Sequence, residues 1–516
     1  MNVTMASAPA VRTYGHFIDG ETTSSSEQIV RRSPATGQPL ATFARGTADD
    51  VDRAVKAARR AFDEGPWPRL SGLERGRVLL RLADLMGRDL DKLAMIEAAE
   101  VGKPIRQARA DVENSIALTQ YAASLSMSAH GEIYSNLGEH LTGMVIREPC
   151  GVVGMVTPWN FPLLQLVQKL PFALGAGCTA VCKPAEVASG TTVELAALCA
   201  EAGVPAGAFN VVTGAGSTAG QALTESSLID MVSFTGSTGI GRSVIAAAQT
   251  NIKRVSLELG GKGATIVFAD ADLEDAVEAA IYANVFNSGE CCVSGTRLLI
   301  DRRVADDFTA ALGERLGDLR VGDPMDPETD IGPMIHDAHL AKVISMIDHA
   351  LSEGGSIVAG GSRLSGAPYD AGSFVAPTVI DEVRVESQLF REEVFGPVLA
   401  VTRFDSQDEA IRLANAVDYG LANSVWTKNL DLAWTTARRL RSGTVWINTT
   451  IDGAPQLPGG GVKLSGVGRE MGQAGFDEFT EHKTIQLRTG GWERSIAGRA
   501  EQDPAGAPGP EARPAS

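Results

Sequence analysis

The sequence predicts an α/β protein built on a parallel, doubly wound sheet. From Val152 onward, short apolar runs alternate with helical stretches, and this alternation is typical of βαβ crossovers. A second alternation from Leu273 to about Asn448 predicts a second α/β unit. The chain has 516 residues, 44% hydrophobic and 21% charged, which is the composition of an ordinary globular protein of about two to four domains.

Charge and cysteine usage exclude several classes of protein. The chain carries a net charge of −17, whereas a nucleic-acid binder needs concentrated positive charge. Its six cysteines form no CxxC pair and no zinc-finger spacing, which favours a reducing compartment and no metal site. No apolar run approaches the ~18 residues of a membrane-spanning helix, and the N-terminus lacks the apolar block of a secretory signal. We therefore expect a soluble, cytoplasmic protein that binds neither nucleic acid nor membrane.

The elements of the N-terminal part are predicted to be mainly helices. After a short strand and turn around His16–Gly20, a helix begins at Thr47, whose hydroxyl can cap the first turn while Asp50 supplies the reciprocal acid. Apolar residues then recur at helical spacing through Phe62. Further helices are expected over Leu73–Ala99 and Ile105–Met127, and an extended stretch over Gly131–Glu148.

Six apolar runs then predict the buried strands of the first sheet. Helices are expected between them over Gly190–Ala202 and Ile240–Thr250. The runs are Val152–Thr157, Thr179–Lys183, Phe209–Val212, Met231–Thr235, Val255–Leu257 and Ala264–Phe268.

Glycine is enriched, with 56 residues, or about 11% of the chain against a usual ~7%. This predicts many tight turns, or places where backbone approaches a ligand closely. The turn Gly214–Gly220 has the spacing GxGxxxG and no acidic residue about 20 positions on, so a structural turn is favoured there. The turn Gly236–Gly241 lies between a strand and a helix, and it fits a tight turn or a pyrophosphate site equally well.

Two neighbouring cysteines are candidates for nucleophilic chemistry. Cys291 and Cys292 lie in a polar, glycine-containing turn, which is an unusual place for inert core cysteines. The local sequence leaves two interpretations open, either small buried hydrophobes or a reactive thiol.

A glutamate and an asparagine are candidates to assist such a thiol. Glu258 ends an apolar strand, where it either pairs with Lys262 or Lys253 or has the raised pKa that suits a general base. Asn160 lies between two prolines after a strand, either as an ordinary turn residue or as a donor to a developing oxyanion.

Seven motifs occur in order along the chain, and together they resemble the NAD(P)-dependent aldehyde dehydrogenase superfamily over about residues 14–490. The resemblance implies an α/β, aldehyde dehydrogenase-like fold with a Rossmann-like cofactor domain, an α/β catalytic domain and a small β oligomerisation element. The motifs are PWNFP at 158–162, KPAE at 183–186, FTGST at 234–238, LELGGK at 257–262, the cysteine turn, EEVFGPV at 392–398 and PGGGVKLSGVGRE at 458–470.

The resemblance also implies domain boundaries. The NAD-binding domain is expected over residues 12–130 and 150–260, and the catalytic domain over 261–460. The oligomerisation element is expected over 131–149 and 477–490, where Gly131–Glu148 and Asp477–Arg488 alternate weakly, so a homodimer or homotetramer is implied. Residues 491–516, rich in Pro and Ala from 501 on, are expected to form a disordered tail.

By the same resemblance, Cys292 is the nucleophile that forms a thiohemiacetal with an aldehyde. The Asn160 amide and the Cys292 N–H hold the oxyanion, hydride passes to the nicotinamide, and a thioester remains. Glu258 then activates water to release a carboxylic acid, and Lys183 is placed with the catalytic residues.

NAD is the implied cofactor, preferred over NADP. Lys183 and Glu186 match the contacts to the adenosine ribose, and a carboxylate at Glu186 should repel a 2′-phosphate. The full set of implied cofactor contacts is Thr157, Trp159, Lys183, Glu186, Gly236, Ser237, Leu259, Gly260, Glu393 and Phe395.

Three departures from the family pattern bear on the nucleophile and the substrate. Glu290 stands where Gln is more common, and its charge, if present, would raise the pKa of Cys292. Gly459 replaces an aromatic of the substrate tunnel, and Gln165 and Gln168 either make that tunnel polar or face solvent or another subunit. We expect a small polar or semialdehyde-type substrate. The expected tunnel residues are Phe161, Gln165, Gln168, Cys291, Val293 and Gly459.

Three other functions remain open at this stage. A CoA-acylating aldehyde dehydrogenase would not need the water-activating base Glu258. An NAD-independent cysteine esterase or acyl transferase would turn over activated esters without NAD. A non-catalytic protein that kept the fold would bind NAD and form no NADH.

Overall fold

The structure, a computed structural model, describes residues 11–490, so the expected disordered tail over residues 491–516 lies outside the described residues. The described chain divides into two units. Unit 1 spans residues 11–129 and 148–481, and unit 2 spans residues 130–147 and 482–490. No helix within residues 11–490 is long and apolar enough to cross a membrane.

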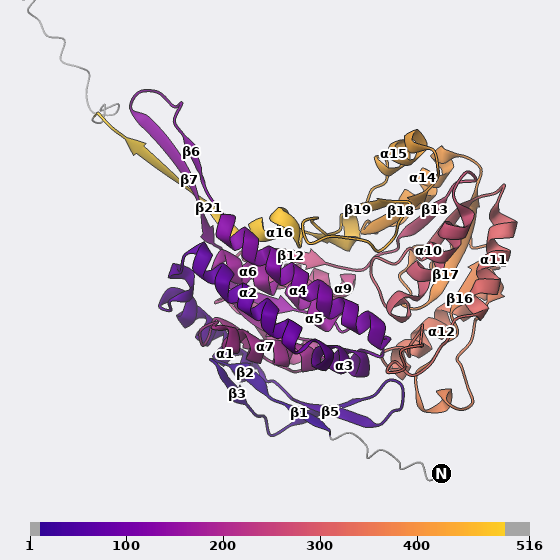
Figure 1. Cartoon of the computed structure of the whole chain (residues 1–516), viewed down its shortest axis with the longest axis horizontal. Helices are drawn as coiled ribbons and strands as arrows, with labels where there is room; N and C mark the ends of the chain where they lie inside the picture. Colours follow the sequence, from indigo (N-terminus) through magenta and orange to yellow (C-terminus); the bar gives the residue numbers. More distant parts are fainter. Residues whose placement is uncertain (1–10, 491–516) are drawn as a thin grey trace, which may run out of the picture. The chain divides into compact units, whose positions relative to one another are not determined.

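Unit 1 contains an eight-stranded sheet whose five central strands are parallel. These strands are largely buried apolar runs, as expected where helices cover a parallel sheet. The helices α1 (Ala48–Asp63), α7 (Gly190–Ala202) and α9 (Thr238–Ala248) pack against them (Figure 1). Antiparallel strands extend both edges. The order is β20 (Gly466–Val467), β12 (Arg254–Glu258), β11 (Met231–Thr235), β8 (Val152–Val156), β9 (Thr179–Lys183), β10 (Phe209–Val211), β2 (His16–Ile18) and β3 (Glu21–Thr23).

A seven-stranded sheet in the same unit is parallel except for one edge strand. The order is β15 (Ser356–Ala359), β16 (Thr378–Asp381), β17 (Val398–Phe404), β14 (Arg297–Asp301), β13 (Ala264–Val267), β18 (Ala422–Trp426) and β19 (Thr444–Ile447). The two sheets confirm the predicted α/β class. The expected domain boundary near residue 260 stays a prediction; β12 ends before it and β13 begins after it, whereas β20 returns to the eight-stranded sheet at residues 466–467.

The N-terminal helices follow the predicted pattern with one difference. The capping box is confirmed, because Thr47 and Asp50 exchange side-chain and backbone hydrogen bonds. The single helix predicted over Leu73–Ala99 is wrong, because the chain breaks at Asp89, whose φ of −99° and ψ of 16° leave the helical region. Gly87 lies two residues before this break, but the apolar periodicity continues across it, so the pattern alone predicts one helix.

The helices and remaining strands of unit 1 have the following bounds. The helices are α1 (Ala48–Asp63), α2 (Gly72–Arg88), α3 (Leu90–Val101), α4 (Ile105–Ser128), α5 (Pro162–Val167), α6 (Leu170–Ala176), α7 (Gly190–Ala202), α8 (Gln221–Glu225), α9 (Thr238–Ala248), α10 (Leu273–Val285), α11 (Ala305–Gly317), α12 (Asp337–Ser352), α13 (Gln388–Arg391), α14 (Gln407–Asn415), α15 (Leu430–Ala437) and α16 (Gly472–Asp477). A small N-terminal sheet has the order β1 (Arg12–Tyr14), β5 (Pro39–Ala44) and β4 (Gln28–Arg32).

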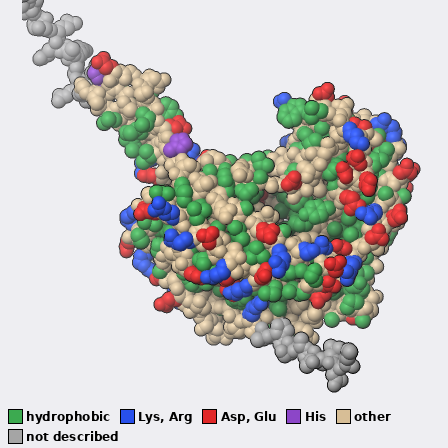
Figure 2. Space-filling model, in the orientation of Figure 1, with side chains coloured by type: hydrophobic (Ala, Val, Ile, Leu, Met, Phe, Trp, Pro, Cys, Tyr) green, Lys and Arg blue, Asp and Glu red, His purple; other side chains and the backbone are tan. Residues whose placement is uncertain are grey.

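Unit 2 contains most of a three-stranded sheet in which β6 and β7 are antiparallel. The order is β21 (Thr480–Arg488), β7 (Leu141–Pro149) and β6 (Glu132–Tyr134). Large apolar side chains on it are exposed, and Ile133 keeps 73% of its surface. In Figure 2, apolar side chains gather on the visible face of this unit, whereas acidic and basic side chains are intermixed over unit 1.

Candidate active site

A cavity of about 270 Å³ lies in unit 1 at the carboxyl ends of the neighbouring strands β8, β11 and β12. Parallel α/β sheets bind their ligands at this edge, where the loops that follow the strands diverge. Further walls come from the cysteine loop (residues 286–294), from α12 and from the loop before β17. The lining residues are Pro158, Trp159, Asn160, Gln165, Thr235, Gly236, Ser237, Leu259, Gly260, Cys292, His339, Lys342, Glu393 and Phe395.

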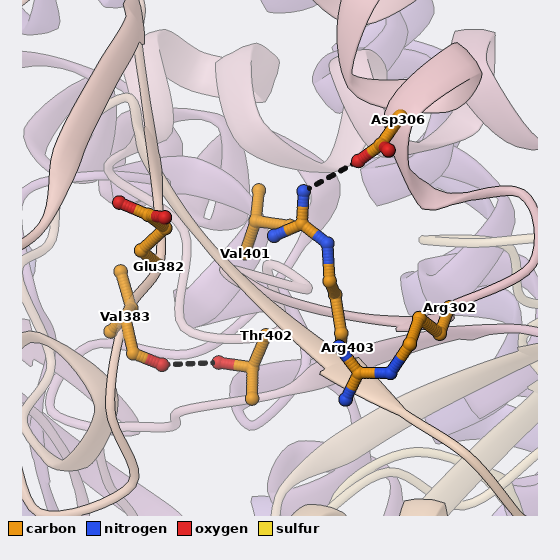
Figure 3. A pocket seen from close by; sticks show the side chains of 7 residues that line it. All are labelled: Arg302, Asp306, Glu382, Val383, Val401, Thr402 and Arg403. Carbon is orange, nitrogen blue, oxygen red and sulfur yellow. Dashed lines mark hydrogen bonds and ion pairs between the residues drawn. The ribbon is translucent and has the colours of Figure 1, made fainter.

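A second, more open cavity of about 500 Å³ lies beside β17 (Figure 3). Its guanidinium groups are already engaged, since Arg403 donates to Asp306 and Asp381, and Arg302 donates to Asp405. It contains no thiol and no buried carboxyl of raised pKa. The first cavity, which Cys292 lines, is therefore the candidate active site.

The cysteine loop is held in a strained backbone conformation. Asn287, Ser288 and Gly289 have successive φ values of 51°, 57° and 75°, in the left-handed region that costs a non-glycine residue energy. A Cβ at Gly289 would lie 2.2 Å from the Gly396 carbonyl carbon. The loop thus packs backbone against backbone on the segment that follows Phe395.

Cys292 lines the cavity, and its pKa is raised well above that of an ordinary thiol. Burial is the largest cause, followed by the neighbouring Cys291 and by the carboxyl groups of Glu393 and Glu258. The thiol is therefore protonated at neutral pH. Cys291 is buried beside it, and burial raises its pKa to about 11.

Glu258 ends β12 with one carboxyl oxygen, Oε1, that has no hydrogen-bond partner among the described residues. Burial raises its pKa well above the ordinary range, and the charge of Glu470 adds to the effect. The alternative of pairing with a lysine is wrong. Lys253 donates instead to the carbonyls of Thr224 and Ser226, and the Lys262 amine has no partner within residues 11–490.

Asn160 is fixed by the cysteine loop rather than by its own turn. Its Nδ2 donates to the Glu290 carbonyl at 2.9 Å, and its carbonyl accepts from Asn287 at 3.1 Å. A side-chain amide carries two N–H groups. One therefore anchors Asn160, and the other is available to the cavity that it lines with Cys292.

The cofactor face of the cavity contains a helix N-terminus and a carboxyl group. Ser237 caps α9, whose first backbone amides open beside Gly236 and favour an anion. Glu393 accepts from the Gly261 N–H at 2.8 Å, and burial raises its pKa to about 7. A Cβ at Gly260 would lie 2.4 Å from Glu393, so this approach requires glycine there.

Three predicted cofactor residues lie outside the lining of this cavity. Lys183 is buried, donates to the Pro184 carbonyl and has a pKa lowered by burial, while Glu186 is half-buried. Thr157 is buried with its hydroxyl unpartnered among the described residues. The Gly214–Gly220 turn packs its backbone on Gly46 and its last glycine on the Lys183 side chain.

Of the expected tunnel residues, only Gln165 lines the cavity, and its buried Oε1 has no partner within the described chain. Phe161 instead stacks on Phe286 and lies 4.0 Å from the Lys103 ammonium. Gln168 is the C-cap residue of α5 and is not among the residues that line the cavity. The others outside the lining are Cys291, Val293 and Gly459, which forms an antiparallel bridge with Glu470.

The expected effect of Glu290 on the nucleophile is wrong. The Glu290 side chain turns away to accept from the Ile335 N–H at 2.9 Å, and it is not among the groups that raise the pKa of Cys292. Burial also raises the pKa of Glu290 itself well above the ordinary range, which favours its uncharged form.

Four of the lining residues are absent from the site predicted from sequence. Pro158 and Thr235 lie within the motifs PWNFP and FTGST, next to the predicted residues Trp159 and Gly236, and that proximity was a sufficient signal for them. His339 and Lys342 belong to α12, which carries no motif, and only the fold brings them to this edge. His339 packs edge-on against Trp159 and Phe395, with ring centroids 5.7 and 6.1 Å away.

Comparisons with known proteins agree with this geometry. The model of the aldehyde dehydrogenase family matches residues 21–485. Betaine aldehyde dehydrogenase of Bacillus subtilis is 42% identical over 475 residues, covering 92% of this chain and 97% of the relative. An NAD-dependent aldehyde dehydrogenase from Sinorhizobium meliloti superposes with a TM-score of 0.92 at 45% identity, over 94% of this chain and 96% of that one. Betaine aldehyde dehydrogenase of Staphylococcus aureus, solved with NAD+, has a TM-score of 0.92 at 36% identity, over 94% of this chain and 96% of that one. The fold, the cavity and these likenesses together establish that the chain belongs to the aldehyde dehydrogenase family.

Proposed function

We propose that the protein oxidises an aldehyde to a carboxylic acid with NAD, through a thioester on Cys292. The observation that carries the proposal is the shared cavity, in which Cys292 faces Asn160 and the carboxyl-bearing cofactor loop at Glu393. Glu258 is close enough to raise the pKa of the Cys292 thiol, which supports its role as a base in the same site.

The first step of the proposal belongs to Cys292 and Asn160. The thiol loses its proton to a base as the sulfur bonds to the aldehyde carbon, and the carbonyl electron pair moves to oxygen. The free N–H of the Asn160 amide and the Cys292 backbone N–H would hold that oxyanion. Because the other Asn160 N–H is already bound to the Glu290 carbonyl, the donor is oriented before substrate arrives.

The residues around the cofactor face fit a dinucleotide. The N-terminus of α9 and Ser237 suit the pyrophosphate, no atom within 4 Å would contact a Cβ at Gly239, and Glu393 suits ribose hydroxyls as an acceptor. When bound, NAD would accept a hydride from the carbon attached to Cys292. We place Glu186 near the adenosine ribose, where its carboxylate would disfavour the 2′-phosphate of NADP.

Glu258 completes the proposed cycle by taking a proton from water as that water attacks the thioester. Its raised pKa, due first to burial and then to Glu470, makes its carboxylate a stronger base than that of an ordinary glutamate. The unpartnered Oε1 leaves one oxygen free for the water. The carbon–sulfur bond then breaks, the proton held by Glu258 passes to the Cys292 sulfur, and the acyl group leaves as the carboxylic acid with the hydroxyl of the water.

The substrate we propose is a small polar or semialdehyde-type aldehyde. The support is Gln165, whose buried amide oxygen lines the cavity and accepts no hydrogen bond within the described chain. A purely alkyl substrate would leave that acceptor unsatisfied, which costs about 1–3 kcal/mol.

Assembly and location form the last part of the proposal. We infer that copies of the chain associate through the sheet of unit 2, because Ile133, Tyr134 and Leu487 expose apolar surface beside unpaired strand edges. The six cysteines are all free thiols, which is in keeping with the reducing cytoplasm.

An NADH-formation screen over polar, charged, aromatic and alkyl aldehydes tests the function, with Cys292→Ala as the blank. We expect aldehyde-dependent NADH with small polar aldehydes and none with the variant. NADH formation that requires CoA would assign the acylating reaction instead, and ester turnover without NAD would assign an esterase. A strong preference for long alkyl aldehydes would overturn the substrate class.

A further inference from the structure

A buried carboxyl group and a backbone carbonyl both face one N–H group at the wall of the cavity. The Nε2 of His339 lies 2.6 Å from the carbonyl oxygen of Phe395 and 3.8 Å from Oε1 of Glu290. A carbonyl accepts only, so the first distance requires that Nε2 carry the proton of the neutral imidazole. Burial lowers the pKa of His339 to about 4, so the ring has this single N–H to donate at neutral and alkaline pH.

The bond to Phe395 matters because Phe395 holds an unfavourable backbone conformation on the cofactor face. Its φ is 60°, and its ring packs edge-on against Trp159 at 5.4 Å. A non-glycine residue in this region persists only where its surroundings hold it. The His339 N–H is one such restraint, and it joins α12 to the loop that carries Glu393.

Glu290 is placed to become a stronger acceptor than that carbonyl. Glu290 is buried. Among the described residues, the Ile335 N–H donates to its Oε1 at 2.9 Å, and Nε2 of His339 lies further from the same oxygen, at 3.8 Å. The cations that face it are Arg31 on β4 and Lys103 before α4.

Neither cation forms a direct ion pair with Glu290. Arg31 donates to the carbonyls of Glu100 and Ile335, and Lys103 is held by the carboxyl groups of Glu97 and Asp111. Cys291 and Cys292 follow Glu290 in its own loop but are not among the groups that shift its pKa, and beyond His339 lies the ring of His336. Since burial is the largest influence on the pKa of Glu290 and raises it well above the ordinary range, the carboxyl keeps its proton to a higher pH than an ordinary glutamate before it ionises.

We propose that Glu290 and the Phe395 carbonyl compete for the Nε2–H of His339, so that ionisation of Glu290 draws His339 away from Phe395 and weakens NAD binding. The inference rests on the proposed function, because it takes the Phe395 loop as part of the NAD site. An ionised acceptor forms roughly twice as strong a hydrogen bond as a neutral carbonyl. Glu290 and His339 act here as positioning residues.

Direct titration of the full-length protein with NAD, without aldehyde, tests the competition. In the wild type we expect Kd for NAD to rise about fivefold between pH ~7.5 and pH ~9.5, the effect of losing one hydrogen bond. Glu290→Gln keeps an acceptor for the Ile335 N–H but cannot ionise, so its Kd should change by less than about twofold over the same range. Glu278→Gln, an exposed carboxyl on α10, is the matched control and should weaken with pH as the wild type does.

A second variant keeps the test valid if Glu290→Gln folds poorly. His339→Ala removes the N–H from both acceptors, so it should bind NAD about fivefold more weakly at pH ~7.5 and show no further weakening at pH ~9.5. A wild-type Kd that does not vary with pH overturns the inference, and so does equal weakening in Glu290→Gln.

The two proposals fail in different ways. If NAD binds and aldehyde-dependent NADH forms, but the pH dependence of Kd is the same with and without Glu290, only the competition is wrong. If NAD binds at neither pH, the cofactor part of the proposed function is wrong and the competition falls with it.

Discussion

The position of Cys292 depends on Gly289, the residue of the strained turn at which a side chain would clash with neighbouring backbone. A Cβ there would meet the Gly396–Pro397 backbone at 2.2–2.3 Å, and the φ of 75° adds strain. We expect Gly289→Ala to displace the loop, lower kcat more than about tenfold and destabilise the protein by about 1–3 kcal/mol. Turnover and urea unfolding measure the two effects. Gly317→Ala, whose Cβ would contact no atom within 4 Å, should match the wild type in both.

The reactivity of Cys292 should follow its raised pKa. Because burial disfavours the thiolate, alkylation by iodoacetamide should be slow at neutral pH and accelerate only above the ordinary thiol range of about 8.5. Mass spectrometry of the Cys292 peptide across pH measures this rate. A midpoint at or below about 8.5 would contradict the burial argument. The midpoint should not move in Glu290→Gln, since Glu290 does not face the thiol.

Residue identity allowed Cys292, Glu258 and Asn160 to be singled out from sequence, since each is a reactive type in an unusual setting. His339 could not be found in this way, because it lies in an ordinary amphipathic helix and reaches the cavity only through the fold. Whether Gln168 borders the substrate route stays a prediction. It follows α5 as its C-cap residue, and it is not among the residues that line the cavity with Gln165.

At the scale of elements, a buried lysine between α3 and α4 forms ion pairs with one carboxyl group on each helix. The Lys103 ammonium, fully buried, is held by Glu97 and Asp111, whose side chains are also buried. Removing the cation leaves two uncompensated carboxyl groups. We therefore expect Lys103→Met to lower the free energy of unfolding by about 3–5 kcal/mol.

Urea unfolding tests this expectation, with Arg302→Met as the control. Arg302 pairs with Asp405 at 2.7 Å, but both side chains are more than half exposed, so its loss should cost at most about 1 kcal/mol. Equal effects of the two variants would mean that burial does not set the strength of the Lys103 cluster.

Strands and long helices could be predicted at this scale because their apolar period is set by burial against neighbours. Gly190–Ala202 matches α7, and the buried runs match β8, β9 and β11. The break at Asp89 was not predicted, because the apolar pattern continues from α2 into α3 past Gly87, and both helices pack against α4.

At the scale of the whole molecule, the alternation of strand and helix patterns in the sequence predicts the two sheets. The association of copies of the chain depends instead on apolar surface that a single chain leaves exposed. Leu487, with 54% of its surface exposed, lies on β21 in unit 2. We expect Leu487→Asp to shift the protein toward smaller species, because a charge at an apolar interface is costly.

Light scattering during size-exclusion chromatography measures that shift. Leu430→Asp is the control, since Leu430 is 77% exposed on α15 in unit 1 and should leave the mass unchanged. An unchanged mass for Leu487→Asp would place the interface elsewhere on the chain.

The central claim, oxidation through a thioester on Cys292 that Glu258 resolves, is tested most directly by trapping that thioester. Glu258→Gln is mixed with NAD and a small polar aldehyde, quenched in acid and analysed by peptide mass spectrometry. The account predicts one NADH per site and a Cys292 peptide heavier by the aldehyde less two hydrogen atoms. NADH formed at the wild-type rate with no adduct on Cys292, or an adduct on another residue, would contradict it.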